Sequence, residues 1–181
     1  EPLPDGRLTL GARFDHHKRF GGEFSPRVGW VQTLSRRHSL KLLYGQAYRV
    51  PVFNETNLTN NPVLLGNPDL SPESVRTWDL IWLANWRRTF LQLGYFESHF
   101  DNAIVEVPLA DTPNTRRFVN IDHDPITGVE LEVRHQKGPW ELFANWTHLL
   151  DSPEQTFREA DDTAAVHLNF RRDNWGLGIT S

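Results

Sequence analysis

Six polar residues lie in or directly before one long connection of this 181-residue chain, and their side chains could hold a polar ligand. They are Arg49, Asn54, Glu55, Asn57, Asn60 and Asn61. Their amide, carboxylate and guanidinium groups offer many hydrogen-bond donors and acceptors at low net charge. Asn and carboxylate side chains also bind nearby backbone in turns, so loop architecture is the competing interpretation. We predict that these six residues are the first candidates for ligand contact.

No motif in the sequence predicts catalysis or a bound metal. The chain lacks Cys, a Gly-x-Ser-x-Gly elbow and a phosphate-binding loop that ends in Lys-Ser or Lys-Thr. His16 and His17 are adjacent, and adjacent residues of a strand face opposite sides. The remaining candidates, His135, His148 and His167, are spread over separate segments without the spacing of a zinc site. We therefore predict no enzyme activity, no metal site and no cofactor.

Composition excludes two further classes of protein. With 19 Lys and Arg against 23 Asp and Glu, the net charge is -4, and the scattered basic residues form no stripe for nucleic acid. No run approaches the roughly 18 consecutive apolar residues of a membrane-spanning helix. Seven Trp are many for a chain of this length, and Trp gathers where proteins meet membrane interfaces. Any segment that crosses a membrane must therefore be a strand.

Segments of about ten residues alternate between apolar and polar side chains, as the segment 140–147 does. Successive side chains of a strand leave opposite faces, and about 10 tilted residues cross a bilayer. We predict that one face meets lipid through Trp78, Trp82, Trp86, Trp140, Leu142, Trp146, Val166 and Leu168. We predict that the other face meets an aqueous lumen through Asp79, Asn85, Glu130, Glu132, Arg134, Asn145 and His167.

The connections between these segments alternate between short and long, which is typical of an up-and-down barrel in the outer membrane. Residues 35–38 and 137–139 are of hairpin length, whereas 49–76 forms the longest interruption. Trp78 and Trp86 lie eight positions apart, roughly 26 Å along a strand, which matches an apolar band ~25 Å tall. The same spacing also fits one face of a helix, which remains the alternative for this segment. The facing of 90–101 is left undecided.

The sequence predicts an all-β, antiparallel up-and-down transmembrane β-barrel, of which about eight to nine strands are present. An odd number of strands without a closure signal implies unpaired edges. No signal peptide is recognisable at the start of the chain. We expect residues 1–181 to be part of a larger barrel domain, without the strands that would close it.

Two sequence boxes resemble a known family. The segment 44–55, YGQAYRVPVFNE, and the segment 66–73, GNPDLSPE, are similar to paired boxes in the barrel of TonB-dependent outer-membrane receptors. Further short matches occur in an order similar to the family's. They are the segments 13–15 and 25–27 before the boxes, and Asn120 and the segment 128–132 after them. Receptors for haem in this family place a His between the two boxes, and no His lies between Val52 and Leu70 here.

The resemblance implies a barrel of roughly 22 strands with a plugged lumen. It implies active uptake of a metal chelate, such as a ferric siderophore or cobalamin, driven by an inner-membrane TonB complex. It also implies location in the outer membrane of a Gram-negative bacterium, in contact with outer-membrane lipid. We expect neither the plug domain nor the coupling segment within these residues.

Two other classes remain as alternatives on the sequence alone. A passive porin or an adhesin-like outer-membrane barrel would show the same alternation without a plug. A soluble β-sandwich binding module would bury the strand face that carries the Trp side chains against a second sheet. Exposure of the Trp side chains distinguishes the sandwich from either barrel.

Overall fold

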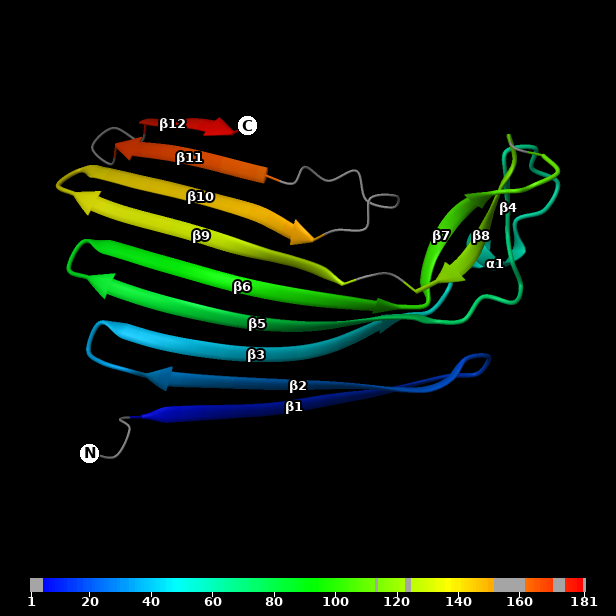
Figure 1. Ribbon diagram of the computed structural model, residues 1–181, viewed down its shortest axis with the longest axis horizontal. Coiled ribbons are helices and arrows are strands. Elements are labelled where there is room, and N and C mark those ends of the chain that lie inside the picture. The colour runs from blue at the N-terminus through cyan, green and yellow to red at the C-terminus, as the bar shows by residue number, and fades with distance from the viewer. Residues whose placement is uncertain (1–4, 113, 123–124, 152–161, 171–174, 181) are drawn as a thin grey trace.

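The computed structural model describes residues 5–112, 114–122, 125–151, 162–170 and 175–180. Nine long strands form one antiparallel sheet in the order β1-β2-β3-β5-β6-β9-β10-β11-β12 (Figure 1). The strands are β1 (Gly6–His17), β2 (Gly21–Thr33), β3 (His38–Arg49), β5 (Glu73–Trp86), β6 (Thr89–Asp101), β9 (Ile126–Lys137), β10 (Trp140–Asp151), β11 (Asp162–Phe170) and β12 (Trp175–Thr180). Within the described residues, β1 and β12 each pair on one side only, so the sheet is open.

The predicted all-β, antiparallel, up-and-down arrangement is confirmed. Neighbours in the main sheet are successive long strands. Short turns join β2–β3, β5–β6 and β9–β10 at one end, whereas the other end carries the three-residue β1–β2 turn and the longer β3–β5 and β6–β9 connections (Figure 1). Residues 73–86 form the strand β5, so the helical alternative for Trp78 to Trp86 is wrong. Trp78, Trp82 and Trp86 therefore share one face of a strand, while the opposite face carries Ile81 and Leu83 together with Asp79 and Asn85.

Strand register separates the side chains of the main sheet into two sets. Residues directly opposite each other on paired strands share a face. Trp82 lies opposite Leu40 and Leu93, and Leu93 lies opposite Leu131. Leu131 in turn lies opposite Trp146. We call this side the Trp face; it also carries the remaining predicted lipid-facing residues Trp78, Trp86, Trp140, Leu142, Val166 and Leu168.

Large apolar side chains on the Trp face are exposed. Trp78 is 47% exposed, Trp140 48% and Leu93 46%. No second sheet covers this face among the described residues, since the only other sheet has three strands and lies beyond the ends of the main strands (Figure 1). A monomer in water rarely exposes so extensive an apolar surface. The β-sandwich alternative is therefore disfavoured.

Aromatic pairs across neighbouring strands stabilise the Trp face. The rings of Tyr44 and Trp78 have centroids 4.4 Å apart. His38 stacks on Trp82 at 5.5 Å and meets Trp86 edge-on at 5.6 Å. Cross-strand aromatic pairs each contribute roughly 0.2–1 kcal/mol.

We call the opposite side of the main sheet the mixed face, because it carries polar and apolar side chains. Asn85 lies opposite Phe90, which lies opposite Arg134, and the same row continues through Phe143 to His167. The other predicted lumen-facing residues, Asp79, Glu130, Glu132 and Asn145, share this face by register. Register also resolves the undecided segment: Leu91, Leu93 and Tyr95 lie on the Trp face and Phe96 on the mixed face.

Arg134, on the mixed face, contacts one carboxylate and two aromatic rings. Its Nε donates to Glu132 at 2.7 Å. Its guanidinium lies 5.9 Å from the ring centroid of Phe90 and 5.4 Å from that of Phe143. The planar guanidinium suits both contacts, because it forms ion pairs at its edge and stacks through its face.

One glycine of the mixed face is required by close packing. A Cβ at Gly128 would lie 2.5 Å from Cζ of Phe96 and 2.9 Å from the backbone oxygen of His148. We predict that Gly128→Ala destabilises the complete protein by about 1–2 kcal/mol, because extra volume in a packed site forces neighbours aside. Urea-induced unfolding from phospholipid vesicles measures this loss.

Gly94→Ala is the matched control, because its Cβ would meet nothing closer than 3.8 Å. If both variants unfold at the same urea concentration, the close packing of Phe96 against Gly128 does not contribute to stability.

The longer connections contain secondary structure of their own. The connection 50–72 holds the short helix α1 (Phe53–Asn57) and the strand β4 (Leu64–Leu65). The connection after β6 holds β7 (Ala103–Pro108) and β8 (Arg116–Ile121). These strands form a second sheet in the order β4-β8-β7, with β4 parallel to β8. No helix among the described residues is long and apolar enough to cross a membrane.

Candidate functional site

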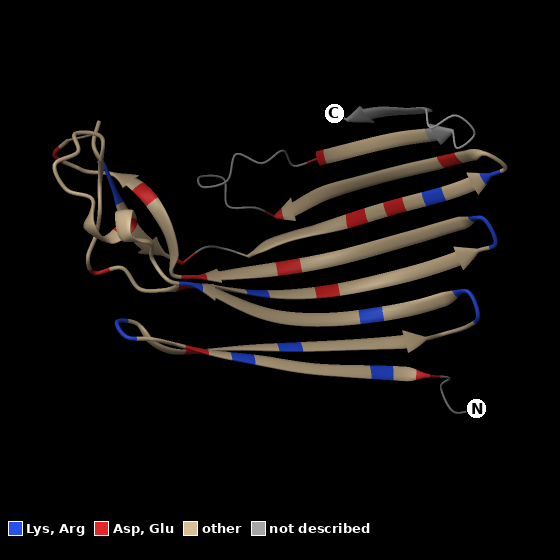
Figure 2. Ribbon diagram, turned by 180° about the vertical axis from the view of Figure 1, so that it is seen from behind, with Lys and Arg blue, Asp and Glu red and all other residues tan. Residues whose placement is uncertain are grey.

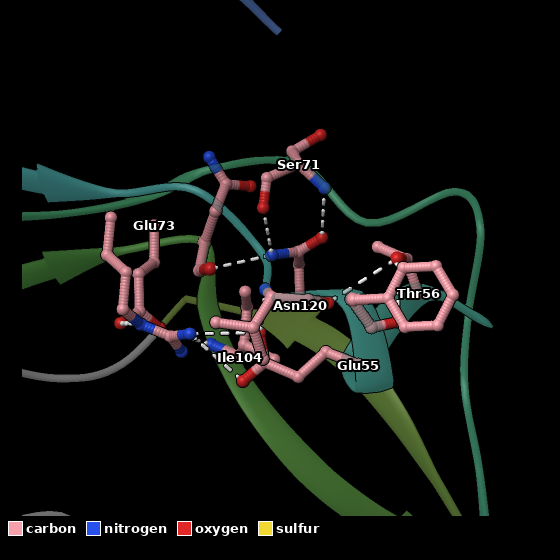
Figure 3. A network of polar contacts seen from close by, with 10 residues as sticks. Glu55, Thr56, Ser71, Glu73, Ile104 and Asn120 are labelled. Carbon is pink, nitrogen blue, oxygen red and sulfur yellow. Dashed lines mark hydrogen bonds and ion pairs between the residues drawn. The ribbon is translucent and has the colours of Figure 1, made fainter. Parts of the chain in front are cut away.

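One ion-pair network joins the end of β3 to both long connections. Nη1 of Arg49 lies 3.0 and 2.9 Å from the two carboxylate oxygens of Glu55, and Nε of Arg49 lies 2.6 Å from Glu73 (Figure 3). The side chain of Glu55 is only 13% exposed and that of Glu73 27%. Arginine suits this position because its fork of N–H groups serves two carboxylates at once.

The two carboxylates also bind backbone. Glu55 accepts a hydrogen bond from the N–H of Val52 at 2.7 Å, at the start of α1. Glu73 accepts one from the N–H of Ile104 at 2.9 Å, in β7. The hydrogen bond to Glu73 raises the pKa of Arg49 above its ordinary value and Glu55 adds to the effect, although burial opposes it. Arg49 therefore fixes α1 and β7 relative to β3 and β5.

Two asparagine amides hold the segment 66–72 against the small sheet. Nδ2 of Asn67 donates to the carbonyl of Phe118 at 3.0 Å. Oδ1 of Asn120 accepts from the N–H of Ser71 at 2.8 Å, and its Nδ2 donates to the Ser71 carbonyl at 3.0 Å (Figure 3). Nδ2 of Asn120 also donates to the carbonyl of Asn102 at 2.7 Å. The contacts with Phe118 and Ser71 join segments about fifty residues apart in the sequence.

The structure places the six candidate ligand-binding residues in two groups. Arg49 and Glu55 bind each other, and Asn57 and Asn61 bind nearby loop atoms. Asn54 and Asn60 are exposed and have no side-chain hydrogen bond to the described residues. Direct ligand contact remains a prediction for all six, and the unpaired amides of Asn54 and Asn60 are the best placed for it.

Sequence reasoning did not select three residues that organise this site, namely Asn67, Glu73 and Asn120. All three lie in segments noted for their family resemblance, which was the available signal. Their partners are backbone groups and side chains of distant segments, and a single sequence does not reveal such pairing.

Two hollows flank the network at the long-connection end of the sheet. One, of about 730 Å³, lies over β1, β2 and β3 and is lined by charged residues that include Arg13, Asp15 and Arg27. The other, of about 670 Å³, lies beside β7 and is lined by Arg49, Glu106 and other residues. Both volumes are within the usual range for sites that bind small molecules.

Replacing Arg49 tests its organising role. We expect Arg49→Met to speed amide hydrogen exchange at Val52 and Ile104 about tenfold, because each loses a carboxylate held in place by Arg49. The effect is modest because the Arg49 side chain is 42% exposed and solvent screens the pairs.

Arg49→Lys is the matched control. It keeps the charge but cannot bind both carboxylates through a planar fork, so we expect an intermediate exchange rate. Unchanged protection of both amides in Arg49→Met would contradict the organising role.

A family model described as TonB dependent receptor-like, beta-barrel matches residues 2–180. The chain belongs to the TonB-dependent receptor family. The family consists of receptors and transporters and is not a family of enzymes.

Among curated proteins, this TonB-dependent receptor chain is similar to the iron-regulated outer membrane virulence protein of Vibrio cholerae. The two are 37% identical over 73 residues, which cover 38% of this chain and 11% of the relative. The match therefore spans only a small part of that protein.

Solved structures share the fold. The siderophore receptor PirA from Acinetobacter baumannii superposes with a TM-score of 0.78 at 21% identity, over 97% of this chain and 30% of that protein. A mutant of the ferric enterobactin receptor PfeA from Pseudomonas aeruginosa, in complex with enterobactin, gives 0.79 at 21% identity, over 99% and 30%. The nine-stranded sheet is thus a segment of an outer-membrane receptor barrel, which confirms the predicted fold class.

Proposed function

We propose that this chain forms part of an outer-membrane receptor that takes up a metal chelate, such as a ferric siderophore, by TonB-coupled active transport. The observation that carries the proposal is the family match over residues 2–180. The iron-regulated relative and the siderophore receptors of similar fold support an iron chelate within the wider class. The family match also favours this function over a passive porin or an adhesin-like barrel.

The location follows from the same proposal. The Trp face contacts outer-membrane lipid, and the mixed face lines the lumen. The long connections then face the outside and the short turns face the periplasm, as in other barrels of this membrane. This orientation puts Asn54, Asn60 and the two hollows where an external ligand arrives.

The network around Arg49 has a supporting role in this proposal. It holds α1 and β7 at fixed positions, so the exposed amides beside it are presented without a large loss of entropy on binding. Asn54 and Asn60 supply neutral donors and acceptors, which suit the oxygen atoms of a chelate.

Uptake by cells tests the function. The complete receptor containing residues 1–181 is expressed in a Gram-negative strain lacking its own siderophore receptors, and uptake of radiolabelled ferric enterobactin and cobalamin is measured with and without TonB. We expect saturable uptake of at least one chelate that is lost without TonB. Equal uptake in both strains would favour a passive porin and contradict the proposal.

Binding by variants tests the proposed contacts. We expect Asn54→Ala with Asn60→Gly to weaken binding of the transported chelate by roughly thirtyfold, since each of the two lost hydrogen bonds is worth about 1 kcal/mol. Glycine is chosen at position 60 because Asn60 has a φ of 59°. Thr59→Ala, an exposed change between them, is the matched control. Unchanged affinity in the double variant would exclude direct contact.

A further inference from the structure

The short-turn end of the main sheet carries a row of exposed basic residues. We call these the basic rim: Arg36, Arg37, Arg87, Arg88 and Lys137. Each short turn that the structure describes at this end has at least one of them, in β2–β3, β5–β6 and β9–β10 (Figure 2). None of them forms an ion pair with the described residues. Among the described residues, the carboxylates near this end are Asp5 and Glu141.

Aromatic residues of the Trp face lie directly beside these cations. Trp86 precedes Arg87 in the chain, and Trp140 pairs with Lys137 across the β9–β10 hairpin. His38, which follows Arg37, contacts the rings of Trp82 and Trp86. Trp side chains gather at the level of lipid headgroups in membrane proteins. The basic rim therefore lies at or just beyond the headgroup level.

The β5–β6 turn adds an independent observation. Arg87 has a φ of +30°, in a two-residue turn where Asn and Gly are the residues that adopt positive φ easily. Arginine at this position carries a conformational cost without any partner among the described residues. A residue held in a disfavoured conformation is often retained for what its side chain does.

We propose that the basic rim binds the anionic phospholipid headgroups of the membrane leaflet next to the short turns. The cations follow the edge of the sheet from turn to turn, as the plane of a leaflet does, and are not gathered in one compact patch (Figure 2). Arginine and lysine side chains are long enough for their charged ends to reach headgroup phosphate from the turns. The inference rests on the proposed membrane location of this chain.

Spin-labelled lipids test the proposal. The complete receptor is reconstituted into bilayers, and electron paramagnetic resonance compares its association with labelled phosphatidylglycerol and phosphatidylcholine. We expect a preference for phosphatidylglycerol that falls with added salt, with up to about fivefold from each cation that contacts a headgroup. Arg36→Gln, Arg37→Gln, Arg87→Gln and Arg88→Gln together should remove most of it.

Lys18→Gln with Arg19→Gln is the matched control, because these two basic residues lie in the β1–β2 turn at the opposite end of the sheet. We expect this variant to keep the preference. A folded wild-type receptor without a salt-sensitive preference, or an equal preference in the rim variant, overturns the proposal.

Folding is scored separately by the resistance of the inserted barrel to unfolding on a gel. A wild-type receptor that does not insert into bilayers contradicts the proposed membrane location and not the basic rim alone. If the four-residue variant fails to insert, the lipid preference is measured for Arg87→Gln with Arg88→Gln instead. An unchanged preference in that variant, together with no salt dependence in the wild type, overturns the proposal.

Discussion

Leu93→Arg is expected to destabilise the membrane-inserted receptor by about 2–4 kcal/mol, the cost of an arginine facing lipid near the middle of the bilayer. Leu93 lies on the Trp face, is 46% exposed, and pairs with Trp82 on one side and Leu131 on the other. Trp82 is midway along β5 between Trp78 and Trp86, the two residues whose spacing matches the height of an apolar membrane band. Position 93 is therefore far from both headgroup layers. Urea-induced unfolding from phospholipid vesicles, followed by Trp fluorescence, measures the effect.

Gln92→Arg is the matched control on the neighbouring residue. Gln92 lies on the mixed face, opposite Glu132, so in the proposed orientation the new cation meets water and a carboxylate. We expect a change within about 1 kcal/mol. Equal losses in the two variants would mean that the faces of this sheet do not contact different solvents.

Gly66→Ala is expected to open the external loop structure without unfolding the barrel. A Cβ at Gly66 would lie 2.6 Å from the backbone N of Leu58 and 2.9 Å from that of Asn57. These are backbone atoms at the end of α1, and they cannot turn aside as a side chain can. We expect a local loss of about 3 kcal/mol, at the upper end of overpacking costs.

Hydrogen exchange measures this loss at the amides of Gly66 and Asn67, which donate to the carbonyls of Leu58 and Glu55 at 2.7 Å each. Exchange there should rise about a hundredfold, while amides in the middle of the main sheet keep their protection. Gly45→Ala is the control, because its Cβ would meet no atom within 4 Å. Unchanged exchange at Gly66 would show that α1 does not pack against this residue.

The main sheet could be predicted from the sequence because period-two alternation acts locally. The pattern of Trp78, Trp82 and Trp86 needs no knowledge of other strands, and the short turns near Arg36 and Arg87 mark the hairpins directly. The facing of 90–101 could not be predicted, because Phe96 is apolar on the mixed face. Its ring lies over Gly128, a contact with a strand about thirty residues away.

The structured connections could not be predicted for a related reason. The segment 103–121 mixes apolar and polar residues and is interrupted by Pro108, and it forms strands because β4 and β7 pair with β8. For the candidate site, the sequence pointed to the connection and to Arg49 and Glu55. It did not reveal that these two bind each other, since their pairing depends on where α1 packs.

The central claim is that the two faces of the main sheet contact different solvents, lipid on the Trp face and water on the mixed face. Spin labels at Leu142, Ala144 and Val166 of the complete receptor in bilayers test it most directly, with labels at Asn145 and His167 on the mixed face for comparison. We predict strong relaxation of the first three labels by lipid-soluble oxygen and of the other two by a water-soluble nickel complex. Protection of the first three labels from oxygen would contradict the claim.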